Sequence, residues 1–127
     1  MVFDKINMFY EKSLKIKSPL EIRFLEDCTT VGLIVVPQYP IGKIHADFAV
    51  PDKKIVIELD SKEWHATEES KIKDDERDQI YLSEGWKIVR ITGKCVYKYG
   101  EKIAEEIRNF EDDDSWNFRA YGDNFND

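Results

Sequence analysis

The sequence is poor in cysteine and histidine, and this shortage limits the metal sites that the chain can build. Its 127 residues contain two cysteines, Cys28 and Cys95, and two histidines, His45 and His65. Structural zinc sites need closely spaced cysteine and histidine ligands, which these four residues do not provide. Two unrelated thiols and an N-terminus without a signal-peptide pattern are typical of the reducing cytoplasm, where we expect this protein.

Long apolar runs are also missing. The longest one, residues 31–36, is interrupted by Gly32 and is far shorter than the roughly 20 residues that a membrane helix needs. The composition, 42% hydrophobic and 35% charged, is that of a soluble globular protein. The length fits one domain, so we expect a single core and no membrane contact.

Positive charge is scarce, because 19 lysines and arginines stand against 26 acidic residues, for a net charge of −7. Such a chain cannot present its whole surface to nucleic acid. The excess is concentrated in residues 111–127, where six acidic residues accompany one arginine. We expect a single folded domain over residues 1–110, followed by an acidic, mobile tail over 111–127 whose four aromatic residues could dock it.

The first half of the chain reads as helix, helix and strand. Apolar spacing over residues 4–16 indicates an amphipathic helix. Ser18, Pro19 and Glu21 form the pattern of a capping box, which predicts a helix over residues 19–30. Residues 33–36 then read as a strand, and the prolines and glycine over residues 37–42 read as breaks near a sheet edge.

The second half alternates helix and strand. Residues 68–84 form a charged helical pattern that Gly85 ends, and residues 86–91 alternate as a strand that crosses back into the sheet. Apolar residues over 99–110 predict a closing helix. The fold class is therefore α/β, with a mixed central sheet flanked by helices.

Between the two halves, residues 43–50 and 54–60 predict a β-hairpin. The turn is formed either by Asp52 and Lys53 alone or by all four residues from 51 to 54. In both cases Val50 pairs with Ile55, Phe48 pairs with Ile57 and Ala46 pairs with Leu59, which completes one apolar face.

The opposite face of this hairpin sets Asp47 directly across from Glu58, with His45 and Asp60 beside them. Cross-strand neighbours lie about 5 Å apart, and like charges at that distance destabilise a sheet. A divalent metal ion would offset the repulsion. Mg²⁺ needs only one or two carboxylates, completed by water and substrate phosphate, so we predict a metal site at Asp47 and Glu58.

Several motifs, spread from about residue 18 to 92, occur in an order similar to that of very-short-patch-repair-like (Vsr-like) endonucleases. They are Ser18-Pro19-Leu20-Glu21, Gln38-Tyr39-Pro40-Ile41-Gly42, Asp47-Phe48, Glu58-Leu59-Asp60, Trp64-His65, Arg77 with Tyr81-Leu82, and Gly85-Trp86-Lys87-Ile88-Val89-Arg90. These enzymes belong to the PD-(D/E)xK superfamily, and the sequence also resembles the EDxHD homing endonucleases. The resemblance implies a restriction-endonuclease-like core and DNA cleavage that depends on Mg²⁺ or Mn²⁺.

The chain departs from the superfamily pattern at one position. The lysine that usually follows the second acid is replaced by Asp60, and the obvious Pro-Asp pair, Pro51-Asp52, lies at the hairpin tip. Another group must therefore orient or deprotonate the attacking water, and His65 and Lys62 are available. Histidine accepts protons near neutral pH, which suits a general base, although a structural role in a loop is the alternative for His65.

Four more residues are candidates, each with a structural alternative. Glu21 could reach the site through a metal-bound water or only complete its capping box, and Asp60 could assist the metal or only end its strand. Arg77 could bind the scissile phosphate or pair with Asp74 on its own helix. Gln38 could hold the site or a phosphate, or be an ordinary edge-strand side chain.

A metal held by Asp47 and Glu58 would stabilise the charge that develops during phosphodiester hydrolysis and activate water. The favoured function is a metal-dependent DNA endonuclease. The main alternative is a catalytically inactive nuclease fold that binds nucleic acid or a protein partner, and a third is a hydrolase of another phosphate ester. DNA is the expected partner. Because the chain is acidic, tight binding could require a homodimer or a DNA-binding region outside these residues.

Overall fold

The structure is a computed structural model that describes residues 18–60, 67–111 and 116–122. The predicted helix over residues 4–16 and the candidates Lys62 and His65 lie outside these ranges. The elements follow the order α2 (Pro19–Val31), β1 (Val36–Ile41), β2 (Ile44–Val50), a short 3-10 helix η1 (Pro51–Lys53), β3 (Ile55–Asp60), α3 (Glu68–Ser83), β4 (Lys87–Thr92), α4 (Gly93–Asn109) and β5 (Phe118–Tyr121). No helix within the described ranges is long and apolar enough to cross a membrane.

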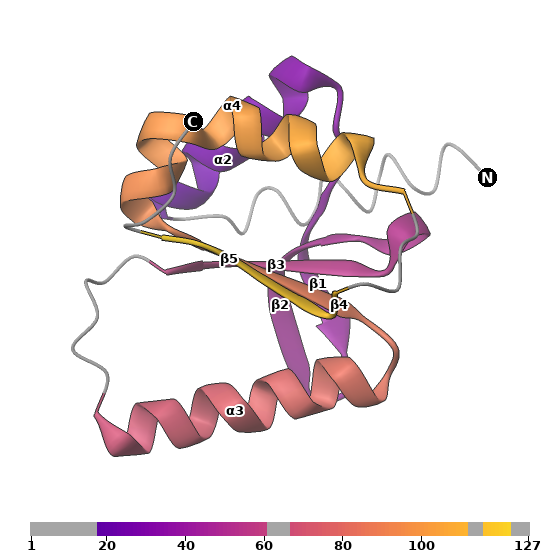
Figure 1. The fold of residues 1–127 in the computed structure, drawn as a ribbon, viewed down its shortest axis with the longest axis vertical. Helices are drawn as coiled ribbons and strands as arrows, with labels where there is room; N and C mark the ends of the chain where they lie inside the picture. The colour runs from indigo at the N-terminus through magenta and orange to yellow at the C-terminus, as the bar shows by residue number, and fades with distance from the viewer. Residues whose placement is uncertain (1–17, 61–66, 112–115, 123–127) are drawn as a thin grey trace.

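One mixed sheet of five strands, in the order β1-β2-β3-β4-β5, forms the centre of the molecule. The first three strands are antiparallel, whereas β3, β4 and β5 run parallel to one another. Helices α2 and α4 cover one face of the sheet and α3 lies on the other (Figure 1). Because parallel neighbours need a crossover, α3 makes the connection from β3 to β4. The expected α/β class with a mixed sheet flanked by helices is confirmed.

Alternate residues of β3 supply the two cores. Ile55 and Ile57 pack with residues of α2 and α4, whereas Val56 packs in a smaller cluster with Tyr81 of α3. Side chains of a strand alternate between its faces, so Glu58 follows Val56 toward α3. This alternation brings a carboxylate to the α3 face, where Tyr81 and Arg77 contact it.

The hairpin forms in the predicted register but closes over a shorter length. Val50 pairs with Ile55 and Phe48 with Ile57, across a loop that contains all four residues 51–54. The predicted pairing of Ala46 with Leu59 is wrong, because the ladder ends at Phe48. Beyond that point the Asp47 carboxylate, instead of a backbone carbonyl, accepts the N–H of Leu59 at 2.8 Å.

Strand β1 differs from the prediction. We expected residues 33–36 as a strand and the two prolines that follow as breaks, yet β1 runs from Val36 to Ile41 and includes Pro37 and Pro40. The reason is its position at the edge of the sheet, where it pairs only with β2. Proline lacks a backbone donor and is tolerated in edge strands.

The last helix and the last strand also differ from expectation. Helix α4 begins at Gly93, where Thr92 Oγ1 accepts the N–H of Cys95, and a kink at Tyr99 separates this start from the predicted segment. We expected a mobile tail from residue 111, whereas residues 118–121 form β5 parallel to β4. Tyr121 is buried and donates a hydrogen bond to Glu106 at 2.8 Å.

Candidate active site

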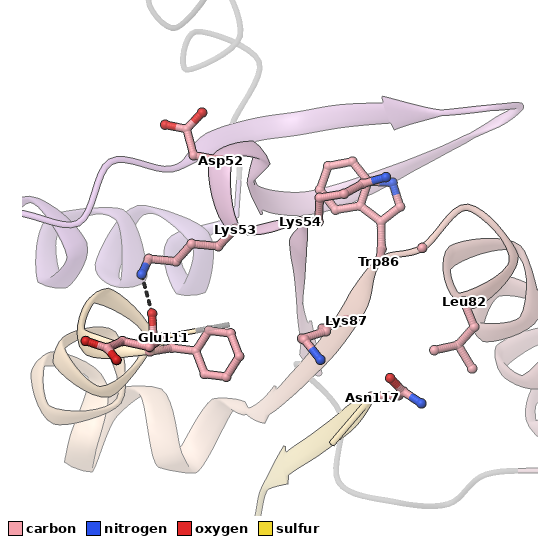
Figure 2. Close-up of a pocket in the computed structure, with 10 residues that line it drawn as sticks. Asp52, Lys53, Lys54, Leu82, Trp86, Lys87, Glu111 and Asn117 are labelled. Atoms are coloured by element: carbon pink, nitrogen blue, oxygen red, sulfur yellow. Dashed lines mark hydrogen bonds between the residues drawn. The ribbon is translucent and has the colours of Figure 1, made fainter. Parts of the chain in front are cut away.

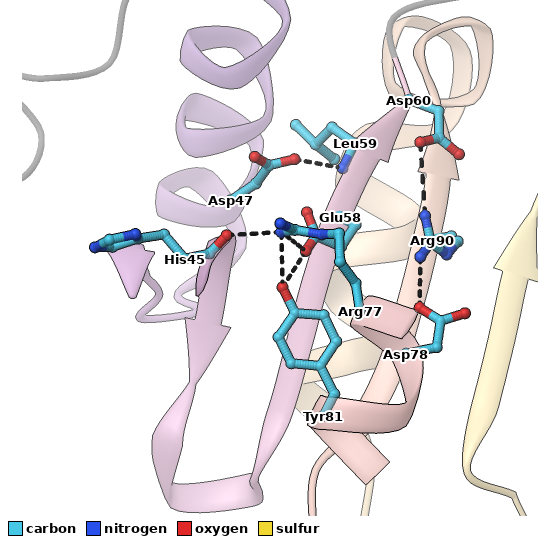
Figure 3. Close-up of polar contacts among 9 residues, drawn as sticks. All are labelled: His45, Asp47, Glu58, Leu59, Asp60, Arg77, Asp78, Tyr81 and Arg90. Atoms are coloured by element: carbon cyan, nitrogen blue, oxygen red, sulfur yellow. Dashed lines mark hydrogen bonds and ion pairs between the residues drawn. The ribbon is translucent and has the colours of Figure 1, made fainter. Parts of the chain in front are cut away.

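Asp47 and Glu58 lie next to each other where β2 and β3 separate (Figure 3). Asp47 is half-buried, and its Oδ2 accepts the Leu59 N–H at 2.8 Å. Glu58 is only 7% exposed. The structure thus brings together the two carboxylates that the predicted register paired. Asp47 is bonded to the backbone of Leu59, the residue that follows Glu58.

Two carboxylates in this position repel each other. Burial and the neighbouring charge of Glu58 raise the pKa of Asp47 to about 7, although the Leu59 N–H acts in the opposite direction. Near neutral pH, Asp47 is therefore only partly ionised, and a nearby positive charge would favour its ionised form. The site has the electrostatic character of a cation site.

Helix α3 holds Glu58 from the opposite side. Arg77 Nη2 lies 3.1 Å from Glu58 Oε1, and the Tyr81 hydroxyl donates a hydrogen bond to the same oxygen. Arg77 also donates to the His45 carbonyl at 2.9 Å and to the Tyr81 hydroxyl at 3.0 Å. The pKa of Arg77 is raised: burial lowers it, but the hydrogen bond and charge of Glu58 outweigh that effect.

Tyr81 belongs to one of the motifs of the family resemblance, but the sequence analysis gave it no role in the site. Its side chain is fully buried, and burial together with the Glu58 hydrogen bond raises the pKa of its hydroxyl. Arg77 and Tyr81 are four residues apart on α3, so they share one helix face. This spacing is visible in the sequence, but their common partner Glu58 belongs to a distant strand.

Glu21 and Gln38 approach the Asp47 side of the site from α2 and β1. Gln38 Nε2 donates to Glu21 Oε2 at 3.4 Å, whereas the Ser18 side chain makes no capping hydrogen bond. The pKa of Glu21 is raised by burial, opposed by the Gln38 bond, and raised further by the charge of Glu58. A capping box requires a hydrogen bond from the helix backbone to the Ser18 side chain, and that bond is not formed. This part of the capping-box alternative for Glu21 is therefore wrong.

The backbone of Gln38 is unusual. The β1–β2 register places this residue across from Asp47, and its φ of 51° lies in the left-handed region that non-glycine residues rarely adopt. Such strain costs on the order of 1–3 kcal/mol and is frequent at functional sites. The left-handed conformation thus marks Gln38, on the edge strand beside Asp47, as a candidate functional residue.

Asp60 belongs to a second group of charges. Arg90 Nη1 lies 3.9 Å from Asp60 Oδ1, and Arg90 Nη2 donates to Asp78 Oδ1 on α3. Burial raises the pKa of Asp60, and the charge of Arg90 opposes this effect. The acid that replaces the expected lysine is thus paired with an arginine of the neighbouring strand β4, which the sequence analysis did not link to it.

Comparison with known proteins agrees with this geometry. Residues 21–110 match the family model REase_MTES_1575, which describes a restriction endonuclease-like family. The chain belongs to this family. Its family and fold are those of nucleases of the PD-(D/E)xK type, as the sequence resemblance implied.

A solved structure of the same fold is the Homing Endonuclease I-Bth0305I Catalytic Domain, with a TM-score of 0.57 and 17% sequence identity. The match covers 72% of this chain and 92% of that domain. A search among curated proteins gave no match. The structural similarity supports the restriction endonuclease-like fold.

Restriction endonuclease-like folds generally use divalent metal ions. Within the described residues, no group of three or more histidine, cysteine, aspartate or glutamate side chains is arranged to hold a metal ion. A set of two carboxylates nevertheless fits Mg²⁺, which commonly takes one or two carboxylates together with water and phosphate oxygens. The raised pKa of Asp47 fits the same interpretation, because a cation would favour its ionised form.

Within the described residues, His45 contributes only its backbone carbonyl to the candidate site. His45 is exposed, and its imidazole points away from Asp47 and Glu58, whereas its carbonyl accepts the bond from Arg77 (Figure 3). The register alone placed His45 on the acidic face. His65 and Lys62 lie outside the described residues.

Proposed function

We propose that this chain is a metal-dependent DNA endonuclease in which Asp47 and Glu58 hold Mg²⁺ or Mn²⁺. The observation that carries the proposal is the pair of adjacent carboxylates, Glu58 buried and Asp47 half-buried, in which burial and the charge of Glu58 raise the pKa of Asp47 to about 7. Membership of a restriction endonuclease-like family supports DNA as the substrate. When bound, such a metal activates water and stabilises negative charge on the phosphate.

The side chains around the pair have distinct proposed roles. The side chain of Arg77 is 35% exposed, and its hydrogen bonds to His45, Glu58 and Tyr81 all use Nη2. Because a guanidinium carries five N–H donors, Arg77 can hold Glu58 and also contact a phosphate of the substrate. Tyr81 fixes the orientation of the Glu58 carboxylate.

Glu21 and Gln38 form the other wall of the proposed site. We assign Gln38 to substrate binding and Glu21 to acceptance of a water hydrogen bond, since the β1–β2 register sets Gln38 across from Asp47 and the charge of Glu21 acts on Asp47. Asp60 would act through Arg90, which orders the β4 side of the site. His65 is the proposed general base, and Lys62 is a proposed phosphate contact and the alternative group for orienting water.

The test is plasmid nicking at low salt in EDTA, Mg²⁺ or Mn²⁺, with wild type compared with Asp47→Ala and Glu58→Ala. We expect nicking that requires metal and falls at least 100-fold in both variants. Glu105→Ala is the matched control, because it removes an exposed carboxylate from α4 and should cleave as wild type does. Nicking that persists in Asp47→Ala and Glu58→Ala would contradict the proposal.

A second candidate function is a nuclease fold that binds nucleic acid or a protein without cutting. The observation in its favour is Asp60, which occupies the position of the usual lysine and pairs with Arg90 at 3.9 Å. In this case no metal would support nicking, while DNA binding would survive Asp47→Ala. A homodimer or a DNA-binding region outside these residues would then provide the missing positive charge.

A further inference from the structure

A pocket of about 700 Å³ lies at the opposite end of β3 from Asp60 (Figure 2). It is bounded by the tip of the β2–β3 hairpin, the start of β4, and the segments on either side of residues 112–115. Lys53, Lys54 and Lys87 line it, together with Trp86 and Phe110. Its volume is within the range of ligand-binding pockets. Neither the predicted site nor the proposed mechanism uses these residues.

Each of the three lysines donates a hydrogen bond to a backbone carbonyl. Lys53 Nζ donates to the Phe110 carbonyl, Lys54 Nζ donates to the Glu84 carbonyl at 2.9 Å, and Lys87 Nζ donates to the Trp116 carbonyl at 2.7 Å. A carbonyl orients an ammonium without cancelling its charge. An ammonium has three donors, so Lys53 and Lys54 can each make further bonds to an anion.

Aromatic rings add to this arrangement. Lys54 lies over the Trp86 ring at 5.4 Å from its centroid, and Lys87 lies 5.3 Å from that of Trp116. Lys87 is only 9% exposed. The face of an aromatic ring favours a cation at a position shielded from water, so both rings help to hold lysines at this pocket.

Two acids, Asp52 and Glu111, also line the pocket. Figure 2 shows the Asp52 carboxylate directed away from the ammonium groups, and Glu111 at the Lys53 end. The same view shows that Lys53, Lys54 and Lys87 point to different parts of the pocket. A single phosphate could not contact all three, whereas a strand that carries successive phosphates could.

We propose that this pocket binds the phosphate backbone of a DNA strand beside the cleavage site. This inference rests on the proposed function and adds to it where the substrate lies. Lys54 precedes Glu58 by four residues along β3, which corresponds to about 13 Å at 3.3 Å per residue. That length spans about four nucleotides at the 3.4 Å rise of one DNA strand. The lysines thus attract a polyanion that the carboxylates at Asp47 and Glu58 repel.

The test is the affinity of the full chain for a fluorescently labelled DNA duplex, measured by anisotropy over a range of salt concentrations, with Ca²⁺ in place of Mg²⁺ to limit cleavage. For Lys53→Gln/Lys54→Gln we expect Kd at 0.1 M salt to rise about tenfold, because two phosphate contacts are lost. The slope of log K against log salt should become shallower by about 2.

Two further variants isolate the pocket. Lys98→Gln/Lys102→Gln removes the same charge from an exposed face of α4 and should change Kd less than twofold. Lys53→Arg/Lys54→Arg keeps the charge and should keep wild-type affinity, which separates loss of charge from loss of the carbonyl bonds. Thermal melting establishes that each variant is folded.

The outcomes separate this inference from the proposed function. Suppose that wild type binds or cuts DNA, and that Lys53→Gln/Lys54→Gln changes Kd no more than Lys98→Gln/Lys102→Gln does. The pocket assignment is then overturned and the nuclease proposal stands. If wild type neither binds nor cuts DNA, both fail. Weaker binding and a shallower slope for the pocket pair alone would establish the contact.

Discussion

The two faces of the central sheet bury their side chains against different kinds of partner. On the α2–α4 face, aromatic and aliphatic residues such as Phe24, Phe48 and Ile103 fill a continuous apolar core. On the α3 face a small apolar cluster lies next to Glu58. The Glu58 carboxylate accepts hydrogen bonds from Tyr81 and Arg77. The comparison shows that the larger apolar core lies on the α2–α4 face, whereas the α3 face combines a smaller apolar cluster with the buried carboxylate of Glu58.

The largest expected effect comes from breaking the apolar face. Phe24 is fully buried, and its ring lies 5.8 Å from that of Phe48. Phe24→Ala should lower the free energy of unfolding by about 3–5 kcal/mol, because it removes a large buried side chain and leaves a cavity. Urea denaturation measures the change. Ile22→Ala, at a position that is 45% exposed on the same helix, should cost less than about 1 kcal/mol. Equal losses in the two variants would contradict the contrast.

A smaller effect is expected on the α3 face. Tyr81→Phe keeps the ring in its cluster but removes the hydroxyl that donates to Glu58. The free energy of unfolding at pH 8 should fall by about 1–2 kcal/mol, since a hydrogen bond to a charged group is lost. Mn²⁺ affinity, measured by calorimetry, should also change if Tyr81 orients Glu58. Tyr97→Phe, on an exposed position of α4, is the control and should match wild type in both measurements.

An effect of similar size is expected when the pH is changed. Asp47 has its pKa raised to about 7 by burial and by Glu58, so protonation of Asp47 stabilises the folded state. This contribution is fully present below the pKa of the unfolded chain, near 4, and is lost as pH rises through 7. In EDTA, wild type should gain about 1–2 kcal/mol relative to Asp47→Asn between pH 8 and pH 5.5. Parallel pH profiles from urea denaturation of the two proteins would contradict the raised pKa.

Local patterns predicted much of this fold. The Ser18-Pro19 start of α2, the helix ended by Gly85, and the pairing of Val50 with Ile55 all depend on residues close in sequence. Strand β5 was missed because its four residues follow an acidic run and pair only with β4, far away in the chain. The prolines of β1 were misinterpreted because their tolerance depends on an edge position that the sequence does not display.

The candidate site divides in the same way. The hairpin register brought Asp47 and Glu58 together in the prediction, because a two-residue period and a short turn determine it. Periodicity cannot reveal that α3 folds back over β3, so the bonds from Arg77 and Tyr81 to Glu58 were not foreseen. The pairing of Asp60 with Arg90 depends on β3 and β4 being parallel neighbours, which only the crossover establishes.

The point where β2 and β3 separate, beyond Phe48 and Ile57, has a practical consequence for NMR spectroscopy. Where the ladder ends, the amide of Leu59 is bonded to the Asp47 side chain. Its proton resonance will therefore follow the ionisation of that carboxylate, and its nitrogen shift will change when a cation draws the same oxygen away. Within the described residues, the Leu59 amide can therefore report the state of the proposed metal site in solution, without a substituted residue.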